Sequence, residues 1–147
     1  MTKQDTYSRY KFITDASHGW LSVPLEDIRK LGIADKISRY SYMTHTRVYL
    51  EEDCDAFVSL EASGLDPQDI QHNHSDHAKC RGYASYHPSW IHNPFKVGRT
   101  VYVQVNGVKL EGTITGVKQG RYLLEMTDGS RYSIPVNNPL KYVLPEA

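Results

Sequence analysis

A histidine-rich segment of the chain carries residue types that bind metal ions. His72, His74, His77 and Cys80 follow one another at short spacing, with Asp76 among them. Imidazole nitrogen and thiolate sulfur are ligands that zinc prefers, so several of these side chains could reach one ion. The spacing matches no common zinc module, and no second cysteine pair supports it. The favoured prediction is a solvated loop without a cofactor. The alternative is a zinc site formed by His74, His77 and Cys80, at the centre of a metal-dependent enzyme.

A run of acidic residues surrounds Cys54. Such a run is typical of a helix N-terminus, and we expect Asp53 or Asp55 to cap a helix over about residues 54–62. The apolar side chains of this helix are expected to face inward: Phe57, Val58 and Leu60. The alternative is an acidic contact surface or a cation site formed by four acids: Glu51, Glu52, Asp53 and Asp55.

Cys54 is also a candidate nucleophile. A cysteine near a helix N-terminus has a lowered pKa, and a histidine could act as its base. The surrounding acids raise the pKa of Cys54 again and make the thiolate less available. The chain has no P-loop, no dinucleotide-binding glycine motif, no H-E-x-x-H and no G-x-S-x-G. We therefore expect a protein that is not an enzyme.

Aromatic residues gather near the middle of the chain. The set is Tyr83, Tyr86, Trp90 and Phe95, with Arg81, Lys96 and Arg99 nearby. Tyr, Trp and Arg are enriched at interface hot spots and also stack on bases, so these residues could form a binding strip. The favoured alternative is that the rings seal the junction between two domains. Together with the four acids, the predicted partner-binding residues are Tyr83, Tyr86, Trp90 and Arg99.

Residues 97–143 show the alternation of short β-strands. Val101, Val103 and Val105 share one face of a strand because side chains alternate at period two. Three pairs that end in glycine predict tight turns: Asn106-Gly107, Gln119-Gly120 and Asp128-Gly129. Gly112 and Gly116 inside one strand indicate a bulge or bend. We expect a last strand over residues 140–143, after a 3₁₀-like turn.

Five short strands of this kind resemble an SH3-like barrel, and the alternative is an open antiparallel meander packed on the rest of the chain. The sequence therefore predicts an α+β protein with domains at residues 1–94 and 95–147. Lys and Arg outnumber Asp and Glu in the second domain, and the first domain shows the reverse. A basic barrel could bind nucleic acid, with four candidate phosphate contacts: Arg99, Lys118, Arg121 and Arg131.

The first domain is expected to hold two hairpins and two short helices. Four runs predict the strands of the hairpins: residues 10–14, 20–23, 40–43 and 47–50. Pro24 suits the start of a helix and Gly32 its end. Residues 71–94 lack clear periodicity, so we expect a loop there with an extended part around residues 81–86.

Composition bounds the compartment and the partners. The formal net charge is zero, which argues against bulk neutralisation of nucleic acid and against an acidic mimic of DNA. The first residues form no apolar run and no stretch approaches the ~20 apolar residues of a membrane span, so we expect neither a secretory signal nor a membrane partner. Cys54 and Cys80 should then be reduced thiols in a cytoplasm, with a disulfide between them as the alternative.

Three strings in the first half of the chain carry a family resemblance: H-G-W-L-S-V-P at residues 18–24, L-G-I-A-D-K-I-S-R-Y-S-Y at 31–42 and V-Y-L-E-E-D-C-D at 48–55. They resemble a family of small uncharacterised proteins carried by bacteriophages, plasmids and other mobile elements. The resemblance covers about residues 10–60 and implies an accessory role in a mobile element. Some such proteins inhibit host defences, including CRISPR systems, by binding to them. The leading hypothesis is therefore a cytoplasmic, non-enzymatic binding protein, an inhibitor of anti-CRISPR type, whose partner is a host or phage protein.

Overall fold

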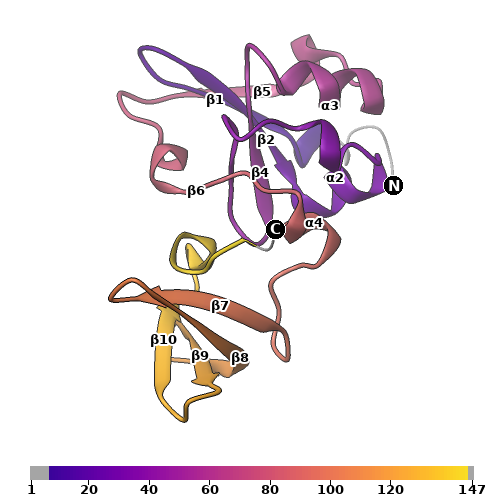
Figure 1. Ribbon diagram of the computed structural model, residues 1–147. Coiled ribbons are helices and arrows are strands. Elements are labelled where there is room, and N and C mark those ends of the chain that lie inside the picture. The colour runs from indigo at the N-terminus through magenta and orange to yellow at the C-terminus, as the bar shows by residue number, and fades with distance from the viewer. Residues whose placement is uncertain (1–6, 146–147) are drawn as a thin grey trace.

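The computed structural model describes residues 7–145 and shows two β-sheets. One sheet has six strands and lies beside three short α-helices, and the other has four strands and curls at the C-terminal end of the chain (Figure 1). This arrangement confirms the predicted α+β class.

The six-stranded sheet is built around the two predicted hairpins, which are confirmed. Its strand order is β5-β1-β2-β4-β3-β6. The bounds are β1 Lys11–Thr14, β2 Gly19–Pro24, β3 Tyr42–Met43, β4 Arg47–Glu51, β5 Gln71–His74 and β6 Ala84–Ser85. β1 pairs with β2, β3 with β4, and β2 with β4, all antiparallel. β5 was predicted to be loop but forms an edge strand parallel to β1.

Three short α-helices lie wholly within the part of the chain that the structure describes, and two of them were expected. They are α2 Leu25–Lys30, α3 Ala56–Ser63 and α4 Ser89–His92. α2 follows Pro24 directly and ends before Gly32, which adopts φ +68. Glycine takes that left-handed conformation without the steric cost of a Cβ, so it stops the helix as predicted.

The predicted orientation of α3 is partly wrong. Phe57 is 67% exposed, whereas Ala56 is buried. Asp55 caps no amide of the helix; its Oδ2 instead accepts from Ser38 Oγ and Ser41 Oγ, both at 2.6 Å. These bonds tie the start of the helix to the loop before β3 and leave Phe57 on the solvent side.

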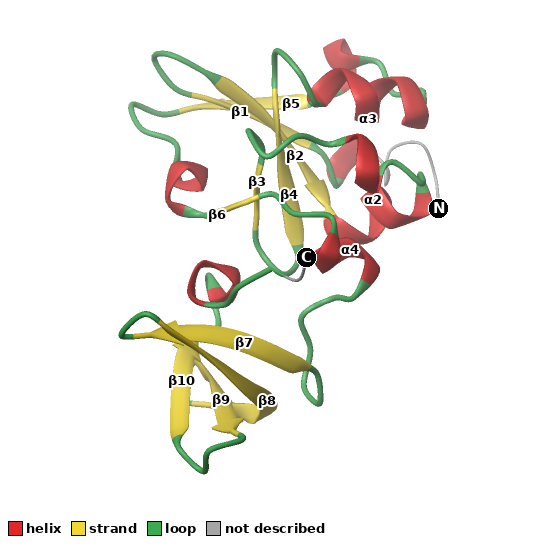
Figure 2. Cartoon of the chain, in the orientation of Figure 1, coloured by secondary structure: helices red, strands yellow, loops and turns green. Residues whose placement is uncertain are grey.

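The six-stranded sheet has two different faces because neighbouring side chains alternate. One face, which includes Leu21 and Leu50, belongs to the main hydrophobic core, on the side where the helices lie (Figure 2). The other face carries Trp20 and Tyr49 and is only partly covered, by the segment that contains the 3₁₀ helix η3 Lys79–Gly82. We call this second face the open face.

The four-stranded sheet confirms four of the five strands predicted after residue 97. Its order is β10-β9-β8-β7, and every neighbouring pair is antiparallel. The bounds are β7 Thr100–Val105, β8 Val108–Lys118, β9 Arg121–Met126 and β10 Arg131–Pro135. Asn106 and Gly107 both have positive φ, as a type I′ turn requires. The register shifts between Ile114 and Gly116, so the predicted bulge is present.

The fifth predicted strand is not formed. Residues Pro139–Tyr142 form a 3₁₀ helix, η4, and the chain then meets β7 at one bridge, where Leu144 N donates to Tyr102 O at 2.8 Å. Pro139 has a fixed φ and no N–H to give to a strand ladder, which favours the helical turn. Leu140 still packs inward and is buried.

Aromatic rings fill the junction between the two sheets. The Phe95 ring lies between Trp90 and Tyr122, with ring centroids 6.2 Å and 4.8 Å away. His45 packs edge-on against Phe95 at 6.1 Å, and the Arg99 guanidinium lies 4.2 Å from the centroid of Trp90. The interpretation in which the predicted rings seal the junction is confirmed for Trp90 and Phe95, and one hydrophobic core extends across it. Tyr83 and Tyr86 contact other parts of the first sheet region instead, Tyr49 and Ala34 respectively.

Candidate functional site

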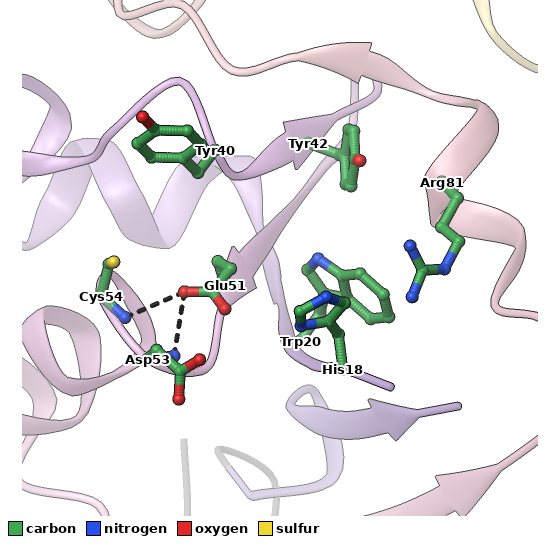
Figure 3. A pocket seen from close by; sticks show the side chains of 8 residues that line it. All are labelled: His18, Trp20, Tyr40, Tyr42, Glu51, Asp53, Cys54 and Arg81. Atoms are coloured by element: carbon green, nitrogen blue, oxygen red, sulfur yellow. Dashed lines mark hydrogen bonds between the residues drawn. The ribbon is translucent and has the colours of Figure 1, made fainter. Parts of the chain in front are cut away.

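A pocket opens at one end of the two central strands of the six-stranded sheet, where β2 begins and β4 ends (Figure 3). Because the two strands are antiparallel, Trp20 near the start of β2 lies opposite Glu51 at the end of β4. The residues just outside the strands, His18 and Asp53, come together for the same reason. The cavity has a volume of about 390 Å³.

The walls of the pocket are aromatic on one side and acidic on the other. The lining residues are His18, Trp20, Tyr40, Tyr42, Glu51, Asp53, Cys54 and Arg81. Tyr40 is 65% exposed at the rim, whereas Trp20 is 2% exposed at the floor. We call this cavity the acidic–aromatic pocket.

Glu51 organises the acidic wall. Its Oε2 accepts from the backbone N–H of Asp53 at 2.9 Å and of Cys54 at 3.0 Å, so the carboxylate closes the turn that leads to α3. The same carboxylate raises the pKa of the Cys54 thiol, because a hydrogen bond to Glu51 favours the protonated form and the negative charges nearby oppose a thiolate. This agrees with the sequence-based argument against Cys54 as a nucleophile.

Trp20 is held from the side by Arg81. The guanidinium carbon of Arg81 lies 4.9 Å from the centroid of the Trp20 ring, and Figure 3 shows the ring between Arg81 and Glu51. Asp15 fixes the position of Arg81, since the Arg81 Nε donates to Asp15 Oδ2 at 2.6 Å. The indole Nε1 of Trp20 is buried and has no hydrogen-bond partner among the residues that the structure describes.

Three side chains of the pocket could hold a cation together. His18, Glu51 and Asp53 each offer one ligand atom, and these atoms lie within 4.8 Å of one another. Imidazole nitrogen with carboxylate oxygen suits a first-row divalent ion. Across residues 7–145, no other set of three His, Cys, Asp or Glu side chains comes together in this way.

The alternative considered for the histidine-rich segment, a zinc site of His74, His77 and Cys80, does not form, because these side chains do not come together. His72 and His74 lie in β5 along the sheet edge, and His77 is exposed in the loop that follows. Cys80 turns inward and is buried in a cluster with Trp20, where burial raises the pKa of its thiol to about 11. A parallel strand pairing, which the polar sequence of residues 71–74 does not signal, separates the histidines from the cysteine.

The four predicted partner-binding acids occupy three different environments. Glu51 and Asp53 line the pocket. Glu52 is exposed beside it, and its carboxylate occupies the space where a Cβ on Gly19 would lie. Asp55 is 3% exposed and is used inside the fold, so it cannot belong to an outer contact surface.

The predicted aromatic residues are mostly internal. Tyr86, Trp90 and Arg99 are 3%, 3% and 6% exposed, so the prediction of an outer strip that includes them needs correction. The Tyr86 hydroxyl donates to the carbonyl of Ala34 at 2.5 Å. Tyr83 alone of this group reaches the surface, on the open face of the six-stranded sheet.

The basic residues predicted for nucleic acid lie apart from the pocket, on the four-stranded sheet. Lys118, Arg121 and Arg131 are exposed there, whereas Arg99 is buried at the junction. The Arg121 Nε donates to Ser133 Oγ at 2.7 Å, which holds this side chain along β10.

Sequence reasoning missed four residues of the pocket: Trp20, Tyr40, Tyr42 and His18. Trp20 and Tyr42 lie in hairpin strands that were predicted correctly, and Tyr42 meets β4 within its own hairpin. The meeting of Trp20 with Glu51 depends on the pairing of β2 with β4. That pairing joins two hairpins and has no local signal in the sequence.

Comparison of the chain with protein-family models, with curated proteins and with solved structures gives no match. Within the described residues, both cysteines are free and no helix has the length and apolar character needed to cross a membrane. The evidence for the candidate site is therefore its geometry.

Proposed function

We propose that the protein is a non-enzymatic binding protein that holds a basic side chain of a protein partner in the acidic–aromatic pocket. The observation that carries this proposal is the meeting of the Glu51 and Asp53 carboxylates with the rings of Tyr40 and Tyr42 in one open cavity of about 390 Å³. Carboxylates form charge-assisted hydrogen bonds with guanidinium and ammonium groups, and aromatic faces attract cations.

The exposed ring of Tyr40 supports this function. A tyrosine that is 65% exposed loses much apolar surface to water when a partner covers it, and tyrosine is enriched at interface hot spots. Arg81 already covers the ring of Trp20. The rings that remain for the cation of a partner are therefore those of Tyr40 and Tyr42.

The family resemblance supports the same pocket. Every lining residue except Arg81 falls in one of the three strings at residues 18–24, 31–42 and 48–55. The strings that resemble small proteins of bacteriophages and plasmids are thus the strings that build the pocket. The partner on this proposal is a protein of the bacterial host, and a host-defence complex of the CRISPR type is the specific candidate.

Affinity capture from a bacterial lysate with matched baits tests the proposal. Glu51→Gln removes a carboxylate inside the pocket, and Glu52→Gln removes one just outside it. The wild-type bait and the Glu52→Gln bait should enrich the same host protein, and the Glu51→Gln bait should lose it. Capture of no specific protein, or equal loss with both variants, contradicts the proposal.

A divalent metal ion is the second candidate for the pocket, because the ligand atoms of His18, Glu51 and Asp53 converge within 4.8 Å. Titration of protein without a His-tag with Zn²⁺ and with Mn²⁺ distinguishes the two candidates. His18→Ala should abolish metal binding, and His77→Ala, in the exposed loop, should leave it unchanged. Absence of binding to either ion dismisses the metal and the metal-dependent enzyme that it would imply.

The curled four-stranded sheet with η4 supports an SH3-like barrel as the finer description of the C-terminal region. The bulge in β8, the 3₁₀ helix before the last segment and the bridge from Leu144 to Tyr102 fit that plan. Binding of nucleic acid by this region through Lys118 and Arg131 remains the alternative function. A gel-shift series at rising salt tests it, since phosphate contacts must weaken with salt.

A further inference from the structure

The open face of the six-stranded sheet carries a second site, apart from the acidic–aromatic pocket. Two cavities with volumes of about 360 Å³ and 370 Å³ adjoin there and share Lys11, Ile13 and Tyr49 as lining residues. We call the two cavities together the basic groove.

Strand register places the groove across four strands. Lys11 in β1 lies opposite Ser22 in β2, and Ser22 lies opposite Tyr49 in β4. On the other side, Ile13 in β1 lies opposite Asn73 in β5. Three strand spacings separate β4 from β5, so the groove spans about 14 Å.

The lining of the groove is basic without compensation by acids. Arg9, Lys11, Arg47 and Lys79 line the two cavities, and no Asp or Glu among the described residues lines either one. The acidic–aromatic pocket, by contrast, has two carboxylates in its wall. The formal net charge of the chain is zero, but negative charge is concentrated in the acidic–aromatic pocket and positive charge in the basic groove.

The two lysines are the cations available to a ligand. Arg9 pairs with Asp27 at 2.6 Å, and Arg47 donates to Ser22 Oγ at 2.8 Å, so both arginines already serve the fold. Within residues 7–145, Lys11 and Lys79 take part in no salt bridge. Lys11 belongs to β1, which forms the floor of the groove, and Lys79 belongs to η3, which covers part of the open face.

Two tyrosine rings stand beside these lysines. The centroids of Tyr49 and Tyr83 are 5.2 Å apart, with the ring planes tilted by 51°. Burial raises the pKa of Tyr49 to about 12, so this ring stays a neutral phenol. Tyr83 is half-buried and keeps part of its ring at the surface of the groove.

We propose that the basic groove binds a short stretch of single-stranded nucleic acid. The ammonium groups of Lys11 in β1 and Lys79 in η3 pair with phosphates, and an unpaired base stacks on the exposed part of Tyr83. The Asn73 amide at the β5 end can hydrogen-bond a base edge. The span of about 14 Å exceeds one nucleotide, which favours a strand over a free mononucleotide. A duplex keeps its bases stacked inside and offers none to Tyr83.

Fluorescence anisotropy on the full chain tests the proposal, with a labelled single-stranded 12-mer, the matching duplex and a free mononucleotide as competitor. The double variant Lys11→Gln/Lys79→Gln should weaken binding of the single strand roughly tenfold and lower the slope of log affinity against log salt by about 1.4. Tyr83→Leu should weaken binding about tenfold with no change in that slope.

The matched control is Lys36→Gln/Lys141→Gln, which removes two exposed cations that lie neither in the groove nor in a strand of the four-stranded sheet. This variant should change the affinity less than twofold. The proposal is overturned if the single strand does not bind at low salt, if the duplex binds as tightly, or if the mononucleotide competes as well as the strand. It is also overturned if the control variant, and not the groove variant, loses binding. None of these outcomes depends on the acidic–aromatic pocket, which Glu51→Gln tests separately.

Discussion

The Asp15 carboxylate accepts two hydrogen bonds from the Arg81 guanidinium: Nε donates to Oδ2 at 2.6 Å and Nη2 donates to Oδ1 at 3.0 Å. The same carboxylate accepts from the backbone N–H of His18 at 3.0 Å and of Ala78 at 3.3 Å. One buried acid therefore joins the turn before β2 to the segment that places Arg81 over Trp20. The position of Arg81 in the wall of the acidic–aromatic pocket depends on these hydrogen bonds of Asp15.

Asp15→Asn should lower the melting temperature at neutral pH. The Arg81 guanidinium holds the pKa of Asp15 well below its usual range. An unfolded Asp takes up a proton at a pH of about 4, whereas the folded one stays ionised, so this stability is present above pH ~4 and is lost as the pH falls further. The melting temperatures of wild type and variant should therefore converge between pH 4 and pH 2. Asp76→Asn, in an exposed loop, is the control, and a constant difference across this range contradicts the assignment.

Glu51→Gln should make Cys54 more reactive. The Glu51 carboxylate raises the pKa of the Cys54 thiol, and the thiolate is the form that reacts with iodoacetamide. A Cys80→Ser background leaves Cys54 as the one thiol in the chain. In that background the alkylation rate at pH 8 should rise when Glu51 is replaced by Gln and stay nearly constant when Glu52 is replaced. Equal rates in all three proteins would show that Glu51 does not control the thiol.

His45 should make the fold sensitive to mild acid. Burial between Phe95 and Tyr122 lowers the pKa of His45, so the folded protein keeps the ring neutral. The unfolded chain takes up a proton below pH ~6.5, which means that stability falls as the pH drops from there. His45→Gln should reduce the loss of unfolding free energy between pH 7 and pH 5. A variant with the same pH dependence as the wild type, measured by urea unfolding, would contradict this role.

Trp90→Ala and Tyr40→Ala should differ sharply in stability. Trp90 is 3% exposed in the junction between the sheets, so its truncation should cost about 3–5 kcal/mol of unfolding free energy. Tyr40 is 65% exposed, and its truncation should change stability by about 0.5 kcal/mol or less. Urea unfolding of both variants checks whether the aromatic rings divide into a structural part at the junction and a binding part at the rim of the pocket. Similar losses in both variants would contradict that division.

Local patterns in the sequence predicted most of the fold. The alternation of Val101 and Val103, the turn at Asn106-Gly107 and the helix stop at Gly32 each depend on neighbours in the chain, and each is confirmed. The strand predicted over residues 140–143 failed because Pro139 favours a 3₁₀ helix that still buries Leu140. Burial alone does not distinguish the two structures.

The candidate site was much harder to predict. The carboxylates of Glu51 and Asp53 were identified from the acidic run, but Trp20 and His18 join them only through the pairing of β2 with β4. The parallel pairing of β5 with β1 likewise places polar residues 71–74 in a strand. The sequence does not predict this strand, because these residues show no alternation of apolar and polar side chains. Contacts between distant segments, and not local propensity, build both sites.

The most direct test of the acidic–aromatic pocket uses Trp20 as its own reporter. The chain has two tryptophans, so Trp90→Phe leaves Trp20 alone at the floor of the pocket. An acetylated Gly-Arg-Gly amide should produce a saturable change in the emission of Trp20 with a dissociation constant of about 1 mM. The matching Gly-Gln-Gly peptide should produce none, and Glu51→Gln/Asp53→Asn should weaken the arginine peptide roughly tenfold or more. No saturable change, or the same change with the glutamine peptide, would contradict the binding of a basic side chain in this pocket.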